Sequence, residues 1–443
     1  MKIALFVHCF FPGHFYGTET YTLQLAREYR RKGVDVEVIT AIFPGEPRES
    51  EEITRYVYED IPVTCIDKNY RPNTRIKDTY YQPEIRPVLE KILREMRPDL
   101  IHVTHLINHT AALLEAADGL NIPLYATFTD FYGFCFNNKL EASDESLCAG
   151  PNARRTNCMA CYIKAAGPNP ATPALIRHAS RFPHLGLAAR AIDLARKVPP
   201  LHRGPVDGIM EDLARRPDIL GTLYASYREA AAPTRFMAGA YRRNGFQKPM
   251  RDIWFGIDIA RTPKPPRARA HRPVIGFIGQ MAPHKGVDIL ITAFRRISQG
   301  TAQLKIYGPF DQDPSYVESL KTLAAGHDVE FCGTFPSERI ADIMRGIDLL
   351  AIPSRWYENS PLVLLNALAT HTPVLISDVA GMTEFLEEGK NGFAFARGSS
   401  DDLERRLRAI LADRDGLFGM TANTHFDRTP ALMAAETFAM YRA

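Results

Sequence analysis

Short runs of apolar and β-branched residues recur along this chain, and each is followed by a stretch with helical character. The runs do not alternate between polar and apolar residues, so the strands they predict are covered on both faces. Strands of that kind, joined by helices, form parallel α/β sheets. The predicted strands are Ile3–Val7, Val34–Thr40, Leu100–Thr104 and Leu124–Phe128 in the first half, and Val274–Ile278, Leu304–Tyr307, Val329–Cys332, Leu349–Ile352 and Val374–Ile376 in the second.

The two series of strands predict two doubly wound, Rossmann-like domains that face a cleft. A chain of 443 residues is also too long for a single compact core. We expect a first domain over residues 1–250, a second over 251–425, and a final helix over 426–443 that is free to cross back onto the first domain. A helical insert rich in cysteine and basic residues is expected over 135–220.

Composition excludes several classes of protein. The chain has 54 Lys and Arg against 51 Asp and Glu, and a net charge of +3 is far too small to mark the whole molecule as a nucleic-acid-binding protein. No apolar run reaches the roughly 18–20 residues that span a bilayer. The apolar start is followed by Pro12-Gly13-His14 instead of a signal-peptide cleavage site, so we interpret it as a strand. Seven cysteines, an odd number, are typical of a reducing compartment, and we expect a cytoplasmic protein.

The insert carries a basic, amphipathic segment. Residues 151–203 hold nine Lys and Arg against one acid, Asp193, and Leu185–Val198 has helical periodicity. We interpret this helix as packed on its own domain with a solvated basic face. The alternative is a helix that rests on anionic lipid at the inner face of a membrane, where each basic residue adds about 1 kcal/mol. The apolar stripe is Leu187, Ala191, Leu194 and Val198, and the basic residues are Arg190, Arg196 and Lys197.

Two loops in the second half carry the strongest chemical signals. In Gly276–Gly286 a strand ends, two glycines follow, and Lys285 stands just before a predicted helix. A helix N-terminus beside a lysine suits a diphosphate, although the residue order is not that of a Walker or a dinucleotide-binding loop. In Pro353–Leu362 we expect Ser360 as a helix N-cap and Glu358 at the carboxyl end of a strand, where α/β sheets bind ligands.

Together these loops resemble those of the family-4 (GT4) retaining glycosyltransferases, which have the GT-B fold. The resemblance covers most of the chain and includes Phe11–Glu19, Ala232–Phe236 and Tyr307–Pro309. It implies transfer of a sugar from a UDP- or GDP-sugar to a glycan, a lipid-linked or another acceptor, without a catalytic metal. The second domain would hold the nucleotide-sugar and the first the acceptor, in polysaccharide biosynthesis.

The resemblance also implies roles for single residues. Lys285 would neutralise the diphosphate leaving group, and Glu358 would contact hydroxyls of the donor sugar. Gly17 would let the backbone of the first domain close over the same phosphate. The other donor-binding positions lie after the strands and at the start of the Glu358 helix: Gly279, Gln280, Gly308, Pro309, Thr334, Phe335, Asn359, Ser360, Pro361, Leu362 and Asn366.

Three positions depart from the family pattern. Gln280 stands where a diphosphate-binding Arg is usual, and Asn366 where a second Glu grips the ribose. Thr129 stands where a His is usual, although the following Asp130 is retained. Gln280 replaces a charge-assisted contact of about 1.5–3 kcal/mol with a neutral one of about 0.5–1.5 kcal/mol. These changes favour a subgroup with a cysteine-rich insert.

His105 and Asp130 are the candidates for the reacting centre in the first domain. Each follows a predicted strand, at the edge where parallel sheets bind ligands. The alternative roles are a buried histidine satisfied by its own loop and a helix cap. His102, inside the strand Leu100–Thr104, is expected to be a core residue.

Four cysteines gather within 27 residues of the insert, in the pattern C-x12-C-x9-C-x2-C. A segment this poor in apolar runs needs other support, and a structural zinc ion on four thiolates would supply it. An iron–sulfur cluster uses the same ligands, and disulfides or plain thiols are further alternatives. The predicted ligands are Cys135, Cys148, Cys158 and Cys161.

The sequence therefore predicts a glycosyltransferase, and two alternatives stay open. One is a nucleotide-sugar epimerase or phosphorylase of the same architecture. The other is a sugar-nucleotide-binding protein without turnover, which the residues at Gln280, Asn366 and Thr129 would favour.

Overall fold

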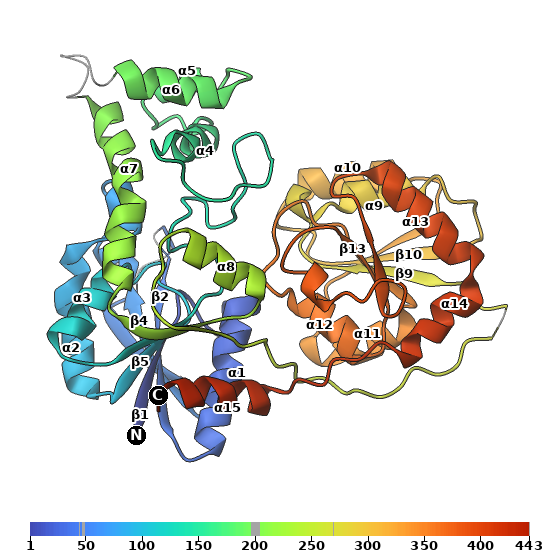
Figure 1. Ribbon diagram of the computed structural model, residues 1–443, viewed down its shortest axis with the longest axis horizontal. Coiled ribbons are helices and arrows are strands. Elements are labelled where there is room, and N and C mark those ends of the chain that lie inside the picture. Colours follow the sequence, from blue (N-terminus) through green and yellow to red (C-terminus); the bar gives the residue numbers. More distant parts are fainter. Residues whose placement is uncertain (44, 47–48, 196–203, 269, 443) are drawn as a thin grey trace. The chain divides into compact units, whose positions relative to one another are not determined.

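The computed structural model describes residues 1–43, 45–46, 49–195, 204–268 and 270–442. It divides into two compact units, Met1–Trp254 together with the segment from Ala431 onward, and Phe255–Pro430. Each unit has a mostly parallel sheet covered by helices (Figure 1). The fold class predicted from the apolar runs is confirmed.

The sheet of the first unit has eight strands in the order β3-β4-β2-β1-β5-β6-β7-β8. Neighbouring strands pair in parallel except β3 and β4, an antiparallel pair at one edge. The apolar runs predicted β1, β2, β5 and β6 and missed β3, β4, β7 and β8. The edge strand β3 mixes half-buried and exposed residues, so it has no apolar run. The strands are β1 (Lys2–Phe6), β2 (Asp35–Ile42), β3 (Ile53–Tyr58), β4 (Ile61–Asp67), β5 (Leu100–Val103), β6 (Leu124–Thr127), β7 (Tyr227–Ala232) and β8 (Met250–Asp252), and the helices beside them are α1 (Gly17–Arg31), α2 (Arg86–Met96), α3 (Ala112–Gly119) and α8 (Arg235–Arg243).

The last helix, α15 (Pro430–Met440), brings the end of the chain to the first unit. Just after it, the Tyr441 hydroxyl lies 2.9 Å from Nδ1 of His102 in β5 and accepts a hydrogen bond from the Tyr29 hydroxyl at 2.9 Å. His102 is fully buried, its Nε2 lies 3.0 Å from the Thr127 hydroxyl, and burial lowers its pKa to about 3. It is a neutral core histidine, as predicted.

The insert of the first unit folds around a small core of its own. Four helices form it, and α4, α5 and α6 gather beyond one end of α7 (Figure 1). None of the helices in the described part of the chain is both long and apolar enough to cross a bilayer. The helices are α4 (Thr156–Ala166), α5 (Ala174–Ala179), α6 (Leu185–Ala195) and α7 (Pro205–Tyr224).

The predicted apolar stripe of α6 faces outward. Leu187 is 61% exposed and Leu194 is 68% exposed, whereas the buried side of α6 consists of Ala189, Ile192 and Asp193. The helix packs on its own domain with Arg190 exposed, as expected, but its buried side is not the predicted stripe, because Ala189 and Ile192 are the residues that reach the core of the insert. Three further residues of that predicted helix, Arg196, Lys197 and Val198, lie outside the described residues.

The second unit has a six-stranded parallel sheet in the order β11-β10-β9-β12-β13-β14. Aliphatic side chains between this sheet and its helices form the core, among them Ile275, Leu304 and Leu349. The strands are β9 (Val274–Ile278), β10 (Gln303–Tyr307), β11 (Val329–Gly333), β12 (Leu349–Ile352), β13 (Val374–Ser377) and β14 (Gly392–Phe395), and the helices are α9 (Val287–Phe294), α10 (Pro314–Ala324), α11 (Ile340–Gly346), α12 (Leu362–Ala369), α13 (Ser400–Ala412) and α14 (Arg414–Gly419).

Each sheet has a point where the chain reverses its direction of growth. In the first unit the reversal lies between β1 and β5, and in the second between β9 and β12. Open α/β sheets bind ligands at the carboxyl ends of the strands beside such a point. The loops after these four strands are therefore the candidate binding loops.

We expect Tyr441→Phe to destabilise the first unit. The change removes two hydrogen bonds and leaves a buried ring nitrogen of His102 unpaired, at a cost of about 1–3 kcal/mol. Urea unfolding of the full chain measures this loss. Tyr16→Phe, at an exposed tyrosine, is the control and should change stability by less than about 0.5 kcal/mol; equal losses in both variants would contradict the role given to Tyr441.

Candidate functional site

A glycine closes the loop after β9 onto the end of β12. Lys285 ends a short 3₁₀ turn, and Gly286 follows it with φ +71°. A Cβ atom on Gly286 would lie 2.0 Å from the carbonyl oxygen of Pro353, the residue after β12. Only glycine combines this conformation with so close an approach. Lys285 is thereby brought to the loop that carries Glu358.

Lys285 and Glu358 form an ion pair, with Lys285 Nζ 2.7 Å from Glu358 Oε1. The same oxygen accepts hydrogen bonds from the Ser354 hydroxyl at 2.6 Å and from the Trp356 indole N–H at 3.0 Å. The ammonium also lies 5.3 Å from the centre of the Trp356 ring, a cation–π distance. The structure thus makes direct neighbours of two residues that are 73 positions apart.

The buried carboxyl of Glu358 is ionised. Burial alone would raise its pKa, but the charge of Lys285 and the hydrogen bonds from Lys285, Ser354 and Trp356 lower the pKa below its ordinary value. A carboxylate accepts hydrogen bonds from sugar hydroxyls, and an ammonium pairs with phosphate oxygens. One small site therefore offers groups for both halves of a sugar phosphate.

The segment after Glu358 turns sharply into α12. Ser360 has φ +59°, and its buried hydroxyl has no hydrogen-bond partner among the described residues. The prediction that Ser360 is the N-cap is wrong: Pro361 is the N-cap, and α12 begins at Leu362. The left-handed turn at Ser360 delays the helix by one residue. Asn359–Leu362 therefore lies between the ion pair and the helix start.

The other predicted donor-binding residues follow three neighbouring strands. The Gly279 N–H donates to the Tyr307 carbonyl and the Gly308 N–H to the Gly333 carbonyl, both at 3.0 Å. A Cβ atom on Gly308 would lie 2.0 Å from the Gly279 oxygen, so these two loops touch. The residues gathered after β9, β10 and β11 are Gly279, Gln280, Gly308, Pro309, Thr334 and Phe335, and Asn366 lies within α12.

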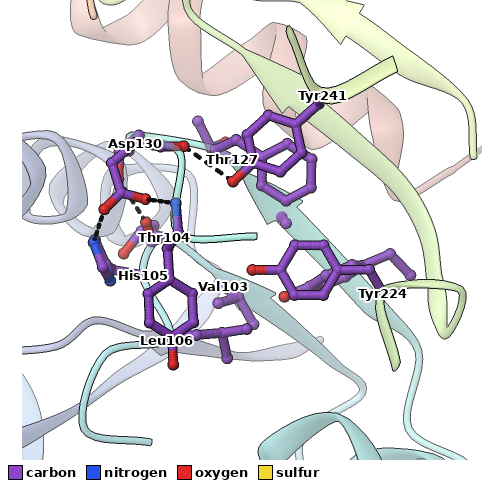
Figure 2. A pocket seen from close by; sticks show the side chains of 13 residues that line it. Val103, Thr104, His105, Leu106, Thr127, Asp130, Tyr224 and Tyr241 are labelled. Atoms are coloured by element: carbon purple, nitrogen blue, oxygen red, sulfur yellow. Dashed lines mark hydrogen bonds and ion pairs between the residues drawn. The ribbon is translucent and has the colours of Figure 1, made fainter. Parts of the chain in front are cut away.

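In the first unit the structure brings His105 and Asp130 together beyond the ends of β5 and β6 (Figure 2). His105 Nε2 lies 2.8 Å from Asp130 Oδ2, and His105 Nδ1 accepts a hydrogen bond from the Ile107 N–H at 3.0 Å. Nδ1 therefore carries no proton, and Nε2 donates to the carboxylate. The Asp130 side chain is 22% exposed and that of His105 only 6%. Asp130 is therefore the more exposed of the two, and His105 holds its carboxylate in place.

Aromatic side chains that sequence analysis did not single out complete this pocket. Tyr132, Tyr224, Tyr227 and Tyr241 line it together with the His105–Asp130 pair. The Tyr241 hydroxyl donates to the Asp130 backbone oxygen at 3.0 Å, and the Tyr132 N–H donates to Asp130 Oδ1 at 2.9 Å. Three of these tyrosines lie about a hundred residues beyond Asp130, in or beside α7, β7 and α8, and no local pattern links them to it.

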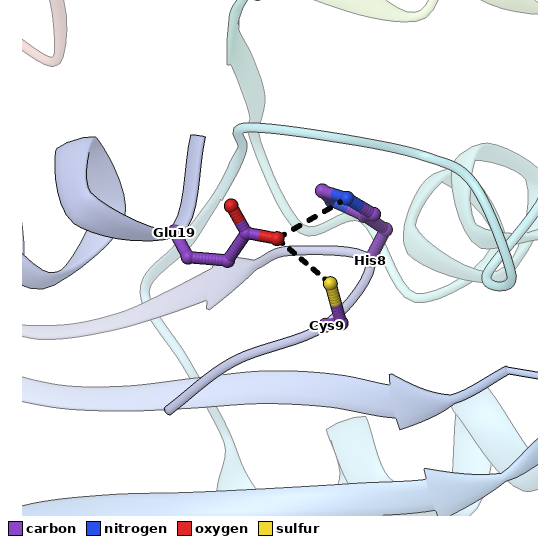
Figure 3. A group of neighbouring side chains, drawn as sticks. All are labelled: His8, Cys9 and Glu19. Atoms are coloured by element: carbon purple, nitrogen blue, oxygen red, sulfur yellow. Dashed lines mark hydrogen bonds and ion pairs between the residues drawn. The ribbon is translucent and has the colours of Figure 1, made fainter. Parts of the chain in front are cut away.

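His8, Cys9 and Glu19 form a second polar cluster, between the end of β1 and the start of α1 (Figure 3). Their possible ligand atoms lie within 4.8 Å of one another. The Cys9 thiol donates to Glu19 Oε1 at 2.8 Å, and burial raises the pKa of this thiol, so the sulfur keeps its proton. The His8 ring lies 4.3 Å from that of His105. This cluster connects the Gly17 end of α1 to the His105 pocket.

The four cysteines of the insert line one small cavity. They come from the loop after β6 and from α4, and all four are free thiols. The structure therefore gathers the predicted ligands Cys135, Cys148, Cys158 and Cys161 in one place.

Comparison with known families gives two matches. Residues 15–142 match the family model "Glycosyltransferase Family 4", and residues 258–424 match "Glycosyl transferases group 1". The D-inositol 3-phosphate glycosyltransferase of Nocardia farcinica is 29% identical over 189 residues, 38% of this chain and 42% of that protein. The sulfoquinovosyl transferase of Arabidopsis thaliana is 26% identical over 147 residues, 32% of this chain and 28% of that protein. The aligned part thus spans less than half the length of either curated relative.

Solved structures resemble the chain over its whole length. Sucrose-phosphate synthase from Thermosynechococcus elongatus has a TM-score of 0.63 at 16% identity and covers 100% of this chain and 98% of its own. HepE from Anabaena, solved with UDP-glucose, has a TM-score of 0.60 at 16% identity and covers 100% of this chain and 97% of its own. Identities this low show the fold alone. With the two family matches, they show that the chain belongs to the GT4-like glycosyltransferases of the GT-B fold.

Proposed function

We propose that this protein is a retaining glycosyltransferase that moves a sugar from a UDP- or GDP-sugar to a glycan or lipid-linked acceptor without a catalytic metal. The Lys285–Glu358 pair carries the proposal, because it sets a cation and an ionised carboxylate beside the reversal point of the second sheet. The UDP-glucose bound to the Anabaena neighbour supports a nucleotide-sugar donor.

Electrostatic stabilisation of the leaving group would supply most of the catalysis. Breaking the anomeric C–O bond puts negative charge on the diphosphate and positive charge on the sugar ring. The Lys285 ammonium and the N-terminal ends of α9 and α12 would stabilise that negative charge. Glu358 would accept hydrogen bonds from hydroxyls of the sugar. Retention follows when the departing phosphate oxygen takes the proton of the acceptor hydroxyl on the same face, so no protein nucleophile is needed.

The His105–Asp130 pocket is the proposed acceptor site. The Asp130 carboxylate can accept a hydrogen bond from an acceptor hydroxyl, while His105 and the Tyr132 N–H hold it in place. The aromatic rings around it are buried and support the Asp130 loop from within the domain. In this arrangement Asp130 touches the acceptor and His105 acts only through Asp130.

The insert is the proposed contact with the inner face of a membrane, where a lipid-linked acceptor would lie. Leu187 and Leu194 of α6 are exposed, as are Leu175 and Phe182 nearby. Within 174–195 the basic residues Arg177, Arg181 and Arg190 outnumber the one acid, Asp193, which is buried. Exposed apolar side chains beside basic ones fit an anionic lipid surface.

Release of nucleotide from a panel of UDP- and GDP-sugars, with and without acceptors, tests the function. We expect release only when a suitable acceptor is present, and the product should keep the donor's anomeric configuration. Lys285→Ala should lower transfer by about 10²–10³-fold, because it removes charge stabilisation of the leaving group. The control is Lys305→Ala, which removes a lysine paired with Glu330 away from this site.

Three outcomes would reject the proposal. Donor turnover without an acceptor would identify the epimerase or phosphorylase. Donor binding without any turnover would identify a binding protein. Near-normal transfer by Lys285→Ala would show that Lys285 does not stabilise the leaving group.

Asp130→Asn should lower kcat with the acceptor by about 100-fold, because the acceptor hydroxyl loses the carboxylate that orients it. His105→Gln should have a smaller effect, about tenfold, because Gln can still donate one hydrogen bond to Asp130. Donor affinity, measured by calorimetry, should be unchanged in both. Asp118→Asn, at an exposed position of α3, is the control. A larger loss in His105→Gln than in Asp130→Asn would reverse the assigned roles.

Membrane contact is measured by sedimentation with vesicles. We expect the protein to bind vesicles that contain phosphatidylglycerol and to bind pure phosphatidylcholine much less. Replacing Leu187 and Leu194 by Ser should weaken binding by about tenfold for each leucine, since burial of one leucine side chain in the lipid contributes about 1.5 kcal/mol or more to the binding free energy. Val57→Ser is the matched control, because Val57 of β3 is also 68% exposed. Equal losses in the α6 variant and the control would refute this contact.

A further inference from the structure

Four free thiols face one cavity although they come from separate parts of the insert. Cys135 lies in the loop after β6, Cys148 lies at the end of the following turn, and Cys158 and Cys161 lie on α4. The last two are three residues apart on a helix, so their side chains point to the same side.

Hydrogen bonds around the cavity suit metal-bound sulfur. The Gly150 N–H donates to Cys148 Sγ at 3.4 Å, and the Asn157 amide donates to the same sulfur at 3.6 Å. Donors of this kind stabilise thiolates that ligate a metal. Gly150 has φ +127°, and a Cβ atom on it would lie 2.1 Å from Asn244 Oδ1. Asn244 in turn donates to the Ala149 carbonyl at 3.0 Å, which anchors this turn to the end of α8.

The loop between the cysteines lacks the apolar burial that would hold it. Within 137–155, all of which the structure describes, Leu140 is the single buried residue. Loops of this kind are often organised by a structural metal instead of a core. Disulfides do not serve here, since all four cysteines are free.

We propose that Cys135, Cys148, Cys158 and Cys161 bind one structural zinc ion as thiolates. Binding releases the four thiol protons, and each thiol gives up the hydrogen bond that it donates: Cys135 to Asn137, Cys148 to the Gly150 carbonyl, Cys158 to Asn157 and Cys161 to the Glu141 carbonyl. Among the described residues, the possible ligand atoms of His8, Cys9 and Glu19 lie within 4.8 Å of one another, whereas no three of the four insert sulfur atoms lie that close together. Binding therefore draws the 137–155 loop toward α4. The site does not depend on sugar transfer, although it lies only five residues beyond Asp130.

Metal content of the full-length protein, purified under reducing conditions with zinc in the medium, tests the proposal. We expect about one zinc ion per chain, lost at least tenfold in Cys158→Ser and in Cys161→Ser. Cys332→Ser, at a cysteine of the second unit, should keep its zinc. Replacement of zinc by Co²⁺ should give sulfur-to-cobalt charge-transfer absorption in the wild type and in Cys332→Ser, but not in the insert variants.

Alkylation followed by mass spectrometry covers the case in which a variant fails to fold. In the wild type, a zinc chelator should expose the four insert cysteines to alkylation and leave the reactivity of Cys332 unchanged. Absence of zinc from the wild type, full zinc content in Cys158→Ser, or iron with acid-labile sulfide in place of zinc would each overturn the proposal.

Discussion

The ion pair between Lys285 and Glu358 is the interaction on which the chemistry proposed for the second unit depends. Burial raises the pKa of the Glu358 carboxyl, but the charge of Lys285 and the hydrogen bonds from Lys285, Ser354 and Trp356 lower that pKa below its ordinary value. The pair exists because the loops after β9 and β12 meet, and they meet because Gly286 has no side chain to strike the Pro353 carbonyl. A charge pair at the reversal point of a parallel sheet is thus a product of backbone geometry. The same geometry sets the pair beside the starts of α9 and α12, where backbone N–H groups favour anions.

The first unit has the same kind of sheet, but different side chains lie beyond the ends of its strands. At its reversal point, histidines and acids replace the lysine and the glycine-rich turn. His105 Nδ1 accepts a hydrogen bond from the Ile107 N–H, and its Nε2 donates one to Asp130. Both ring nitrogens therefore have partners within the protein, and these fix the orientation of the ring. Asp130 is held from a second side by Tyr132 and Tyr241. The result is a partly exposed carboxylate held in place among buried aromatic rings.

The insert differs from the two sheets in how its residues are buried. Its core is small, its thiols converge, and α6 turns its leucines outward. The amphipathic pattern of α6 was visible in the sequence, but the pattern alone does not state which side faces protein. Ala189 and Ile192 fill the limited space in the insert core, and the larger leucine stripe is left for another surface. The packing of α6 against the neighbouring helices determines which of its sides is buried.

The sequence by itself determined the parallel α/β class of both sheets, the strands β1, β2, β5, β6 and β9 to β13, and the loops that carry Lys285 and Glu358, because strand burial and helix starts leave local signals in residue order. It also showed the cysteine spacing. Tertiary structure decided the contacts between distant residues: the Lys285–Glu358 ion pair across 73 residues and the tyrosines of α7, β7 and α8 around Asp130. It also decided that α12 begins one residue later than predicted, after the turn at Ser360, and which side of α6 is exposed. The reason is physical. Period and composition are properties of a few neighbouring residues, whereas a pocket or an ion pair depends on which distant segments the packing brings within a few ångströms.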